Sequence, residues 1–188
     1  MEGIVKSAFD EVASARPLSR RTRAKARFAL WLASRLPLVY RKWSLLGARR
    51  WRRSDAPWAP LEKPIEECTV ALINSGGIIL KGQQPFDLEN PAGDCSYRII
   101  PGDADLGETI ISHAFYDSTS VRLDTEVLFP LGTLRRFAAE GRIGRVAPRH
   151  FSFSGSIPDP TELDRSVAPQ VADMLASDEV DLALLTPA

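Results

Sequence analysis

A nearly continuous apolar run in the middle of the chain places the strongest constraint on its fold. Thr69–Asn74 reads TVALIN, is rich in β-branched residues, and is followed directly by Ser75-Gly76-Gly77. Short apolar runs that end in a glycine turn are typical of strands buried on both faces of a parallel sheet. Such a strand needs a covering layer above and below it, so the run predicts an α/β fold.

Further short strands and helices alternate after this run. We expect strands at Tyr97–Ile100, Thr109–Ser112, Arg149–Phe153 and Val180–Leu185, and helices at Leu131–Glu140 and Thr161–Ala176. Asp159 and Thr161 offer acceptor side chains for the N-cap of the last helix. The alternation predicts a three-layer α/β domain with a mostly parallel sheet, in which Val180–Leu185 is an interior strand.

The net charge of zero conceals two oppositely charged segments. Residues 1–60 hold 14 Lys and Arg against 4 Asp and Glu, whereas residues 61–188 hold 10 against 20. The prolines between Pro57 and Pro64 predict an extended connector. We therefore divide the chain into a basic helical segment at 1–56 and an α/β domain at 57–188. A segment of this charge is expected to seek an anionic partner.

Apolar residues of the basic segment recur at the spacing of an amphipathic helix. They are Phe28, Leu32, Leu36, Val39, Trp43 and Leu46. Pro37 interrupts the stripe and predicts a break near Leu36, because proline is poorly tolerated inside a helix. We favour docking of the stripe on the acidic remainder of the protein or on a second subunit. A membrane-surface helix, a nucleic-acid-binding arm and an organelle transit peptide are the alternatives.

Hydropathy and cysteine content exclude two classes of protein. The longest apolar stretch, Phe28–Tyr40, contains Arg35 and Pro37 and is shorter than the roughly 20 residues of a membrane span, so no transmembrane helix is expected. Two cysteines cannot form a disulfide framework, and no signal-like apolar region follows the N-terminus, which favours the cytoplasm. Cys68 and Cys95 lie far apart, so we expect two buried, inert thiols and no metal site.

Three groups of polar residues are candidates for binding a substrate. The backbone N–H groups of Ser75, Gly76 and Gly77 can approach an anion because glycine has no side chain to obstruct it, although a tight turn without a ligand is an equally good interpretation. Lys81 follows on the same loop and is either a further donor or a solvated surface residue. Asp94 and Arg98, in the segment GDCSYR, predict either a clamp for a substrate carboxylate or a structural ion pair.

His113, Tyr116 and Asp117 are the candidate catalytic residues, in the segment HAFYD that follows an expected strand. A histidine oriented by a carboxylate can act as a general acid or base near neutral pH, and a tyrosine can donate to a developing oxyanion. The alternative is a capped turn with a hydrogen-bonded histidine.

Five blocks of the sequence stand in a characteristic order and spacing: WAPLEKPIEECTVALINSGGIILKGQQPFD, GDCSYRIIP, DLGETIISHAFYD, LFPLGTLRRFAAEGRIGRVAPRHFSFSG and VDLALLTPA. Together they resemble the glycine/sarcosine/betaine and D-proline reductase selenoprotein B family over about Pro57 to Ala188. The resemblance implies a reductase component that cleaves a C–N bond of an amino acid or amine, with other reductase subunits or a thiol donor as partners. The family often has a histidine where Phe115 stands and an asparagine where Glu126 stands.

The resemblance also implies a selenocysteine or cysteine as the redox nucleophile, directly after the strand that here reads DLALLTPA. Because Cys68 and Cys95 do not occupy that place, we expect a C-terminally truncated member whose nucleophile comes just after Ala188. We expect the codon at that place to be a UGA that has been read as a stop. No other cofactor is expected. The alternative, from a different class, is a non-catalytic module that binds a small anion and recruits a partner through its basic helices.

Overall fold

A strand buried on both faces organises the protein. The computed structural model describes residues 18–48, 59–113, 119–155 and 157–187. Strand β1 (Thr69–Asn74) has the bounds that the apolar run predicts. Leu72 contributes to an apolar cluster on one face of the sheet and Ile73 to a cluster on the other, so burial on both faces is confirmed.

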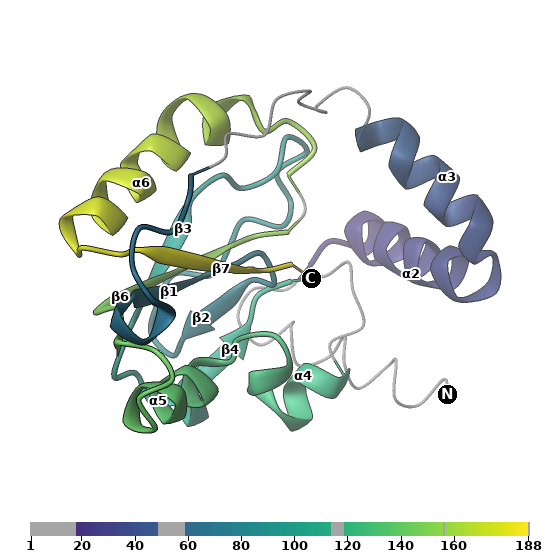
Figure 1. Cartoon of the computed structure of the whole chain (residues 1–188). Coiled ribbons are helices and arrows are strands. Elements are labelled where there is room, and N and C mark those ends of the chain that lie inside the picture. The colour runs from purple at the N-terminus through teal and green to yellow at the C-terminus, as the bar shows by residue number, and fades with distance from the viewer. Residues whose placement is uncertain (1–17, 49–58, 114–118, 156, 188) are drawn as a thin grey trace.

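The main sheet is mostly parallel (Figure 1). One edge of β1 pairs in parallel with β7 (Leu182–Thr186). Its other edge pairs in parallel with β5 (Arg145–Val146) near its start and with β6 (Arg149–Phe153) near its end. Strand β3 (Tyr97–Pro101) adds to β6 in the antiparallel sense.

A separate pair of strands lies beside the carboxyl end of β1. Strand β2 (Ile78–Leu80) pairs in the antiparallel sense with β4 (Thr109–Ile111). We did not expect β2, because three residues are too few for a pattern of alternating polarity. It divides the glycine turn from the segment that carries Lys81.

Helices cover both faces of the main sheet, which confirms the three layers. On one face, Leu131 and Leu134 of α5 (Leu131–Ala139) pack in the cluster that contains Leu72. On the other, Val171 of α6 (Ala168–Ser177) packs with Phe151. Shorter helical segments complete the described elements: α4 (Thr119–Leu123) and single turns at Ile65–Glu67, Leu106–Glu108 and Thr125–Val127.

A π-helical turn directly precedes α6 and continues into it. Residues Leu163–Val167 form a π-helical turn, in which Ala168 donates its backbone N–H to Leu163 O. Pro169 follows directly, and proline has no N–H for an α-helical bond and crowds the preceding turn. The wider turn relieves this conflict. Asp159 accepts a hydrogen bond from the backbone N–H of Thr161, as expected of an N-cap.

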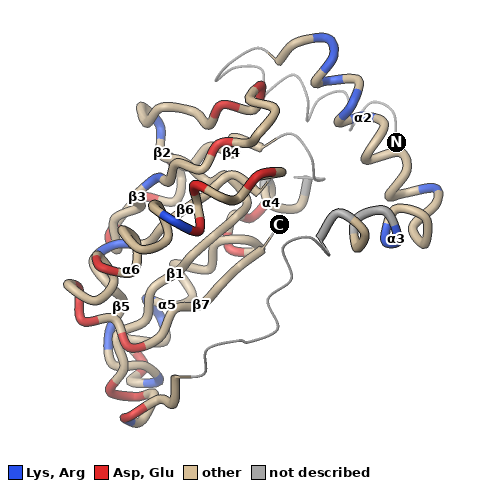
Figure 2. The backbone as a smooth tube through the Cα atoms, turned by 90° about the horizontal axis from the view of Figure 1, so that it is seen from above, with Lys and Arg blue, Asp and Glu red and all other residues tan. Residues whose placement is uncertain are grey.

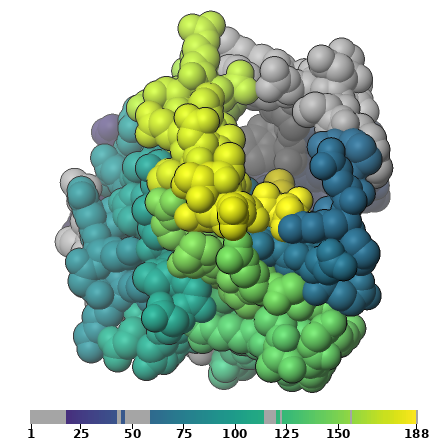
Figure 3. Space-filling model, turned by 60° about the vertical axis from the view of Figure 1, so that its left-hand side comes forward, coloured from purple at the N-terminus to yellow at the C-terminus, as the bar shows by residue number. Residues whose placement is uncertain are grey.

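Strand β7 is an edge strand among the described residues, which corrects our expectation of an interior strand. It pairs with β1, and no described strand pairs with its other edge. Leu184 and Leu185 are exposed, the latter by 67%. Figure 3 shows this yellow segment at the molecular surface. The apolar run predicted a strand with a neighbour on each side. The other two parallel strands, β5 and β6, pair with the second edge of β1 and not with β7.

The basic segment forms two helices that meet at Pro37. Helix α2 spans Arg20–Arg35 and α3 spans Pro37–Ala48, so the predicted break is confirmed. Phe28 and Leu36 are exposed, and α2 turns its small residue Ala26 inward instead, so these two side chains do not dock on the remainder of the protein. Docking on a second subunit stays a prediction. The side chain of Trp43 lies outside the described residues. No described helix is long and apolar enough to cross a membrane.

Candidate functional site

The carboxyl ends of β1 and β7 are joined by one buried amide side chain. Asn74 is the last residue of β1, and its Nδ2 donates to Leu128 O at 3.1 Å and to Thr186 O at 3.0 Å. Its Oδ1 accepts the backbone N–H of Gly76 at 2.7 Å. Because these contacts join β1, the following turn and β7, Asn74 holds this edge of the sheet in one arrangement.

The glycine turn after β1 is built for close packing. A Cβ on Gly77 would overlap with the backbone oxygen of Ser112. The φ of Gly77 is +69°, a backbone conformation that residues other than glycine rarely adopt. The N–H groups of Ser75, Gly76 and Gly77 bond to Thr186 O, Asn74 Oδ1 and Phe153 O respectively. These amides therefore bind the protein itself, which favours the tight turn without a ligand over the anion site.

His113 lies beside this turn, at the end of β4. Ser112, its neighbour, donates its backbone N–H to Gly77 O at 2.7 Å. A Cβ on Gly155 would lie 2.5 Å from Ser75 O and 2.7 Å from Nε2 of His113, so both groups approach one point next to Gly155. Ser75 in turn bonds to Thr186, so His113 lies near the carboxyl end of β7. The structure brings together His113, Ser75 and the end of β7.

Burial keeps the His113 imidazole neutral. The side chain is only 7% exposed, and its desolvation lowers the pKa from 6.5 to about 4. A neutral imidazole has one donor and one acceptor nitrogen, so it can both accept and donate a hydrogen bond. An anion placed beside it would raise the pKa toward neutrality, because an opposite charge favours the protonated form.

Lys81 lies at the far end of the β2–β4 pair, which corrects its expected place on the loop of Ser75–Gly77. It follows Leu80, the last residue of β2, whereas the glycine turn precedes β2. Its exposed Nζ is 3.5 Å from a carboxylate oxygen of Glu108, before the start of β4. Lys81 is thus a surface residue removed from His113 by the length of the two strands.

Arg98 is engaged by the protein rather than open to a substrate carboxylate. Its guanidinium donates to the backbone oxygens of Gln84 and Pro85 at 2.6 and 3.3 Å, and lies 4.3 Å from the centre of the Phe86 ring. It also donates to Ser96 Oγ at 2.9 Å. These contacts account for most of its N–H groups, so Arg98 secures the 84–86 segment. They favour a structural role of Arg98 over the clamp for a substrate carboxylate.

Asp94 organises the same region. It accepts the backbone N–H groups of Asp87 at 2.7 Å and Ser96 at 2.9 Å. Burial raises the pKa of Asp94, but the hydrogen bond from the Ser96 hydroxyl, the two backbone hydrogen bonds and the charge of Arg98 together outweigh burial, so the pKa lies below its usual value. Asp94 and Arg98 both contact Ser96, so their role in this structure is to hold a loop.

Two of the three expected catalytic residues, Tyr116 and Asp117, lie outside the described residues, and their roles stay predictions. Among the described residues, no group of three or more His, Cys, Asp or Glu is placed to hold a metal ion. Asn74 and Gly155 were missed by the sequence reasoning. A polar residue at the end of the TVALIN run was the available signal for Asn74, whereas Gly155 is one glycine among several.

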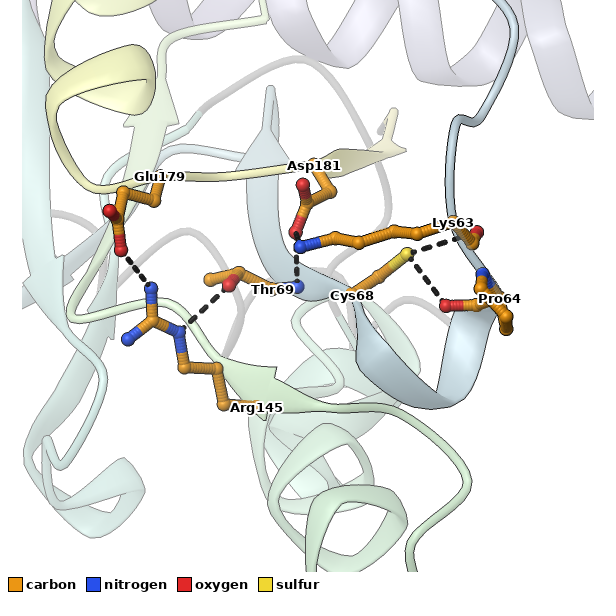
Figure 4. A network of polar contacts seen from close by, with 7 residues as sticks. All are labelled: Lys63, Pro64, Cys68, Thr69, Arg145, Glu179 and Asp181. Atoms are coloured by element: carbon orange, nitrogen blue, oxygen red, sulfur yellow. Dashed lines mark hydrogen bonds and ion pairs between the residues drawn. The ribbon is translucent and has the colours of Figure 1, made fainter.

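The two cysteines are buried, as expected, and burial raises the pKa of each thiol. Cys68 lies at the amino end of β1, away from His113, and its thiol donates to Pro64 O at 3.2 Å. Figure 4 shows this end of the sheet, where Asp181 accepts from Lys63 and from the backbone N–H of Thr69, both at 2.8 Å. These contacts join the chain segments before β1 and β7.

Arg145 extends the same network. It donates to Thr69 Oγ1 at 2.8 Å and to Glu179 at 2.9 Å (Figure 4). Glu179 has a φ of +56°, in the turn that leads into β7. Ion pairs and hydrogen bonds therefore hold the amino end of the sheet together, and His113 lies at the opposite end.

The fold and the residues at the carboxyl edge of the sheet place the protein in the class of open α/β proteins with a candidate ligand site at that edge. In open α/β sheets, ligands bind beyond the carboxyl ends of the strands, which is where His113, Ser75 and the end of β7 meet. The model of the glycine/sarcosine/betaine reductase selenoprotein B family matches residues 53–188. The chain belongs to this family, as its sequence blocks indicated.

Curated relatives agree with this assignment. The chain is 36% identical over 129 residues to the D-proline reductase subunit gamma of Acetoanaerobium sticklandii, a match that covers 69% of this chain and 52% of that subunit. It is 30% identical over 135 residues to the glycine reductase complex component B subunit gamma of Carboxydothermus hydrogenoformans, covering 69% of this chain and 30% of that subunit. The chain thus spans about half of the first relative and less of the second. No solved structure matches it.

Proposed function

We propose that this chain forms part of the catalytic α/β unit of a reductase that cleaves a C–N bond of a small amino acid or amine. The observation that carries the proposal is the position of His113, buried at the carboxyl edge beside Ser75 and the end of β7. Family membership supports the reaction class, and the names of the relatives support glycine or D-proline as substrates to test.

The proposed reaction uses a selenol or thiol nucleophile that follows the β7 block in this family. Its electron pair forms a bond to carbon, and the C–N pair leaves with nitrogen, which takes up a proton. A thiol donor of the assembled reductase then attacks the selenium or sulfur, so that the bond to carbon breaks and carbon leaves with the electron pair and takes up a proton. A second thiol of the donor reduces the resulting selenenyl sulfide or disulfide, which regenerates the nucleophile and leaves the donor oxidised to a disulfide. A selenol or activated thiol is anionic near neutral pH, as this attack requires.

We assign His113 to the proton transfer. In the described structure its pKa is about 4, so it is neutral at pH 7. A substrate carboxylate beside it would raise this pKa, and His113 would then carry the proton needed by the departing nitrogen. Substrate binding and protonation are coupled in this scheme, because each stabilises the other.

Other reductase subunits and a thiol donor are the partners that this function requires. The names of the relatives describe subunits of reductases, one of them a component of a complex. The cytoplasmic location expected from the cysteine content is part of the same proposal, since a thiol donor works in a reducing compartment.

Substitution of His113 in the reductase that contains this chain tests the proposal. His113→Gln preserves a polar side chain but cannot titrate, and we expect kcat for amino-acid-dependent oxidation of a dithiol to fall by about 100-fold or more, the usual scale of general acid catalysis. Lys81→Gln, at the other end of the β2–β4 pair, is the control and retains full activity.

Two results would contradict the proposal. A His113→Gln reductase with wild-type kcat removes His113 from the chemistry. A wild-type reductase that oxidises no dithiol in the presence of glycine, D-proline, sarcosine or betaine removes the reductase function and returns the non-catalytic assembly module as the better explanation.

A further inference from the structure

The helices α2 and α3 form a hairpin that lies outside the residues matched by the family model. Many of its apolar side chains face solvent rather than the α/β domain. These exposed side chains are Phe28, Trp31, Leu36, Leu38, Val39, Leu45 and Leu46. Surface patches of this kind on soluble proteins usually mark an interaction site.

The same hairpin carries only positive charge. Eight Arg and Lys side chains lie on α2 and α3, and all are exposed: Arg20, Arg21, Arg23, Lys25, Arg27, Arg35, Arg41 and Lys42. Figure 2 shows blue segments but no red ones along these two helices. A surface that accepts the hairpin must therefore be anionic over its whole extent.

Basic and apolar groups are interleaved rather than separated. Phe28 and Trp31 stack with their ring centres 6.0 Å apart on the exposed side of α2, directly after Arg27. On α3, a surface hollow is lined by Leu38, Val39 and Leu45 together with Arg41 and Lys42. A partner must therefore accept cationic and apolar side chains that lie next to one another on the surface of the hairpin.

An anionic membrane surface has this property. Its lipid phosphates accept Arg and Lys, while the acyl chains directly below accept Leu and Phe, and a Trp ring suits the boundary between them. A nucleic acid would accept the cations but leave the leucines in water. A second copy of the hairpin would bring sixteen like charges together.

We propose that the α2–α3 hairpin binds the surface of anionic membranes, with its apolar side chains inserted at the level of the headgroups. The hairpin lies on the membrane and does not span it. The proposal stands apart from the reductase function, because it involves none of the residues at the carboxyl edge of the sheet.

Vesicle binding by the full chain tests the proposal. We expect the protein to sediment with vesicles of 30% phosphatidylglycerol in phosphatidylcholine at low salt, and to bind at least tenfold more weakly to pure phosphatidylcholine. Trp31 should move into a less polar environment, so tryptophan emission should shift to shorter wavelength. Binding should weaken in 0.5 M NaCl as the charges are screened.

A matched pair of variants distinguishes insertion of the apolar side chains into the membrane from binding by charge alone. Leu38→Ser with Leu45→Ser leaves the charge unchanged, and we expect it to weaken vesicle binding by tenfold or more. Leu123→Ser with Leu185→Ser removes two exposed leucines of the α/β domain and should bind as the wild type does. Both variants should unfold at the wild-type temperature, because all four side chains are exposed.

Three results would overturn the proposal. Absence of binding to anionic vesicles removes it outright. Tighter binding to a DNA duplex than to vesicles, unaffected by loss of Leu38 and Leu45, assigns the hairpin to nucleic acid. A lower unfolding temperature of the Leu38→Ser, Leu45→Ser variant shows that this face packs within the protein.

Discussion

At the scale of single residues, two buried histidines couple the stability of the protein to pH. His150 is fully buried, and its Nδ1 accepts the backbone N–H of Leu72 at 2.9 Å. Burial, with a smaller contribution from Arg135, lowers its pKa to about 4, the same value as for His113. Both imidazoles are neutral in the folded protein and take up protons on unfolding below about pH 6.5.

We predict that stability is highest above pH 6.5 and declines as the pH falls toward 4. In this window the unfolded chain binds protons that the folded chain excludes, so the free energy of unfolding decreases with falling pH, by at most about 3 kcal/mol for each histidine. His150→Asn keeps an acceptor for Leu72 N–H but cannot titrate, and should remove about half of the slope. Denaturant unfolding between pH 4.5 and 7.5 measures this, and equal slopes for both proteins would contradict it.

Two glycines with nearly the same backbone conformation allow the cost of a strained backbone to be measured separately from the cost of a steric overlap. Gly77 has a φ of +69° and Gly141 of +68°, but only Gly77 has atoms where a Cβ would lie. Gly141→Ala should cost about 1 kcal/mol from the backbone conformation alone. Gly77→Ala must also displace the backbone of Ser112, and we expect a cost of about 3 kcal/mol or more. Equal losses in thermal unfolding would show that the carboxyl edge can relax around this turn.

At the scale of elements, α5 depends on a side chain from outside the helix. Pro130 stands at its N-cap and makes no side-chain cap. Instead the two carboxylate oxygens of Glu126 accept the backbone N–H groups of Gly132 and Thr133 at 2.6 and 2.7 Å. An anion at this end also suits the helix dipole.

Removal of this cap should weaken the protein measurably. Glu126→Ala leaves two N–H groups of α5 without their acceptor, and we expect a loss of about 1 to 2 kcal/mol, or a few degrees in unfolding temperature. Glu140→Ala, at the other end of the helix, removes only exposed ion pairs and should have little effect. A Glu126→Ala protein as stable as the Glu140→Ala protein would show that water replaces the cap.

At the scale of the whole molecule, the α/β domain holds its core without the helical hairpin. The two apolar clusters consist of residues between Cys68 and Leu182. Described hydrogen bonds between the hairpin region and the domain involve Ser19 and Thr22, which both contact Glu89. The charge opposition of the two segments therefore does not produce close packing of the apolar stripe.

Deletion of residues 1–56 should leave the remaining domain folded, with an unfolding temperature within about 3 °C of the full chain. The physical reason is that, among the described residues, the two core clusters contain no residue of this segment. Circular dichroism during heating measures the transition, and light scattering measures solubility. Aggregation of the shortened chain would instead revive the docking of Phe28, Leu32 and Leu36 that the sequence pattern favoured.

The sequence by itself determined the local elements and the family. The apolar run TVALIN defined β1, the proline at 37 separated α2 from α3, and the five ordered blocks identified the reductase family. These inferences held because they depend on patterns within a few neighbouring residues or on block order. His113 was also singled out in this way, as a histidine directly after an expected strand, and its catalytic role stays a proposal.

Only the tertiary structure decided which of these elements meet. The N–H groups of Ser75–Gly77 are bonded to residues 76 to 111 positions away or to the neighbouring Asn74. Arg98 is held by loop carbonyls, and Lys81 lies beyond an unexpected strand. Strand β7 is apolar enough to be interior, yet among the described strands it pairs with β1 alone. Local hydropathy reports whether a segment prefers burial, but the partner of a backbone amide or a strand edge depends on contacts between segments far apart in the chain.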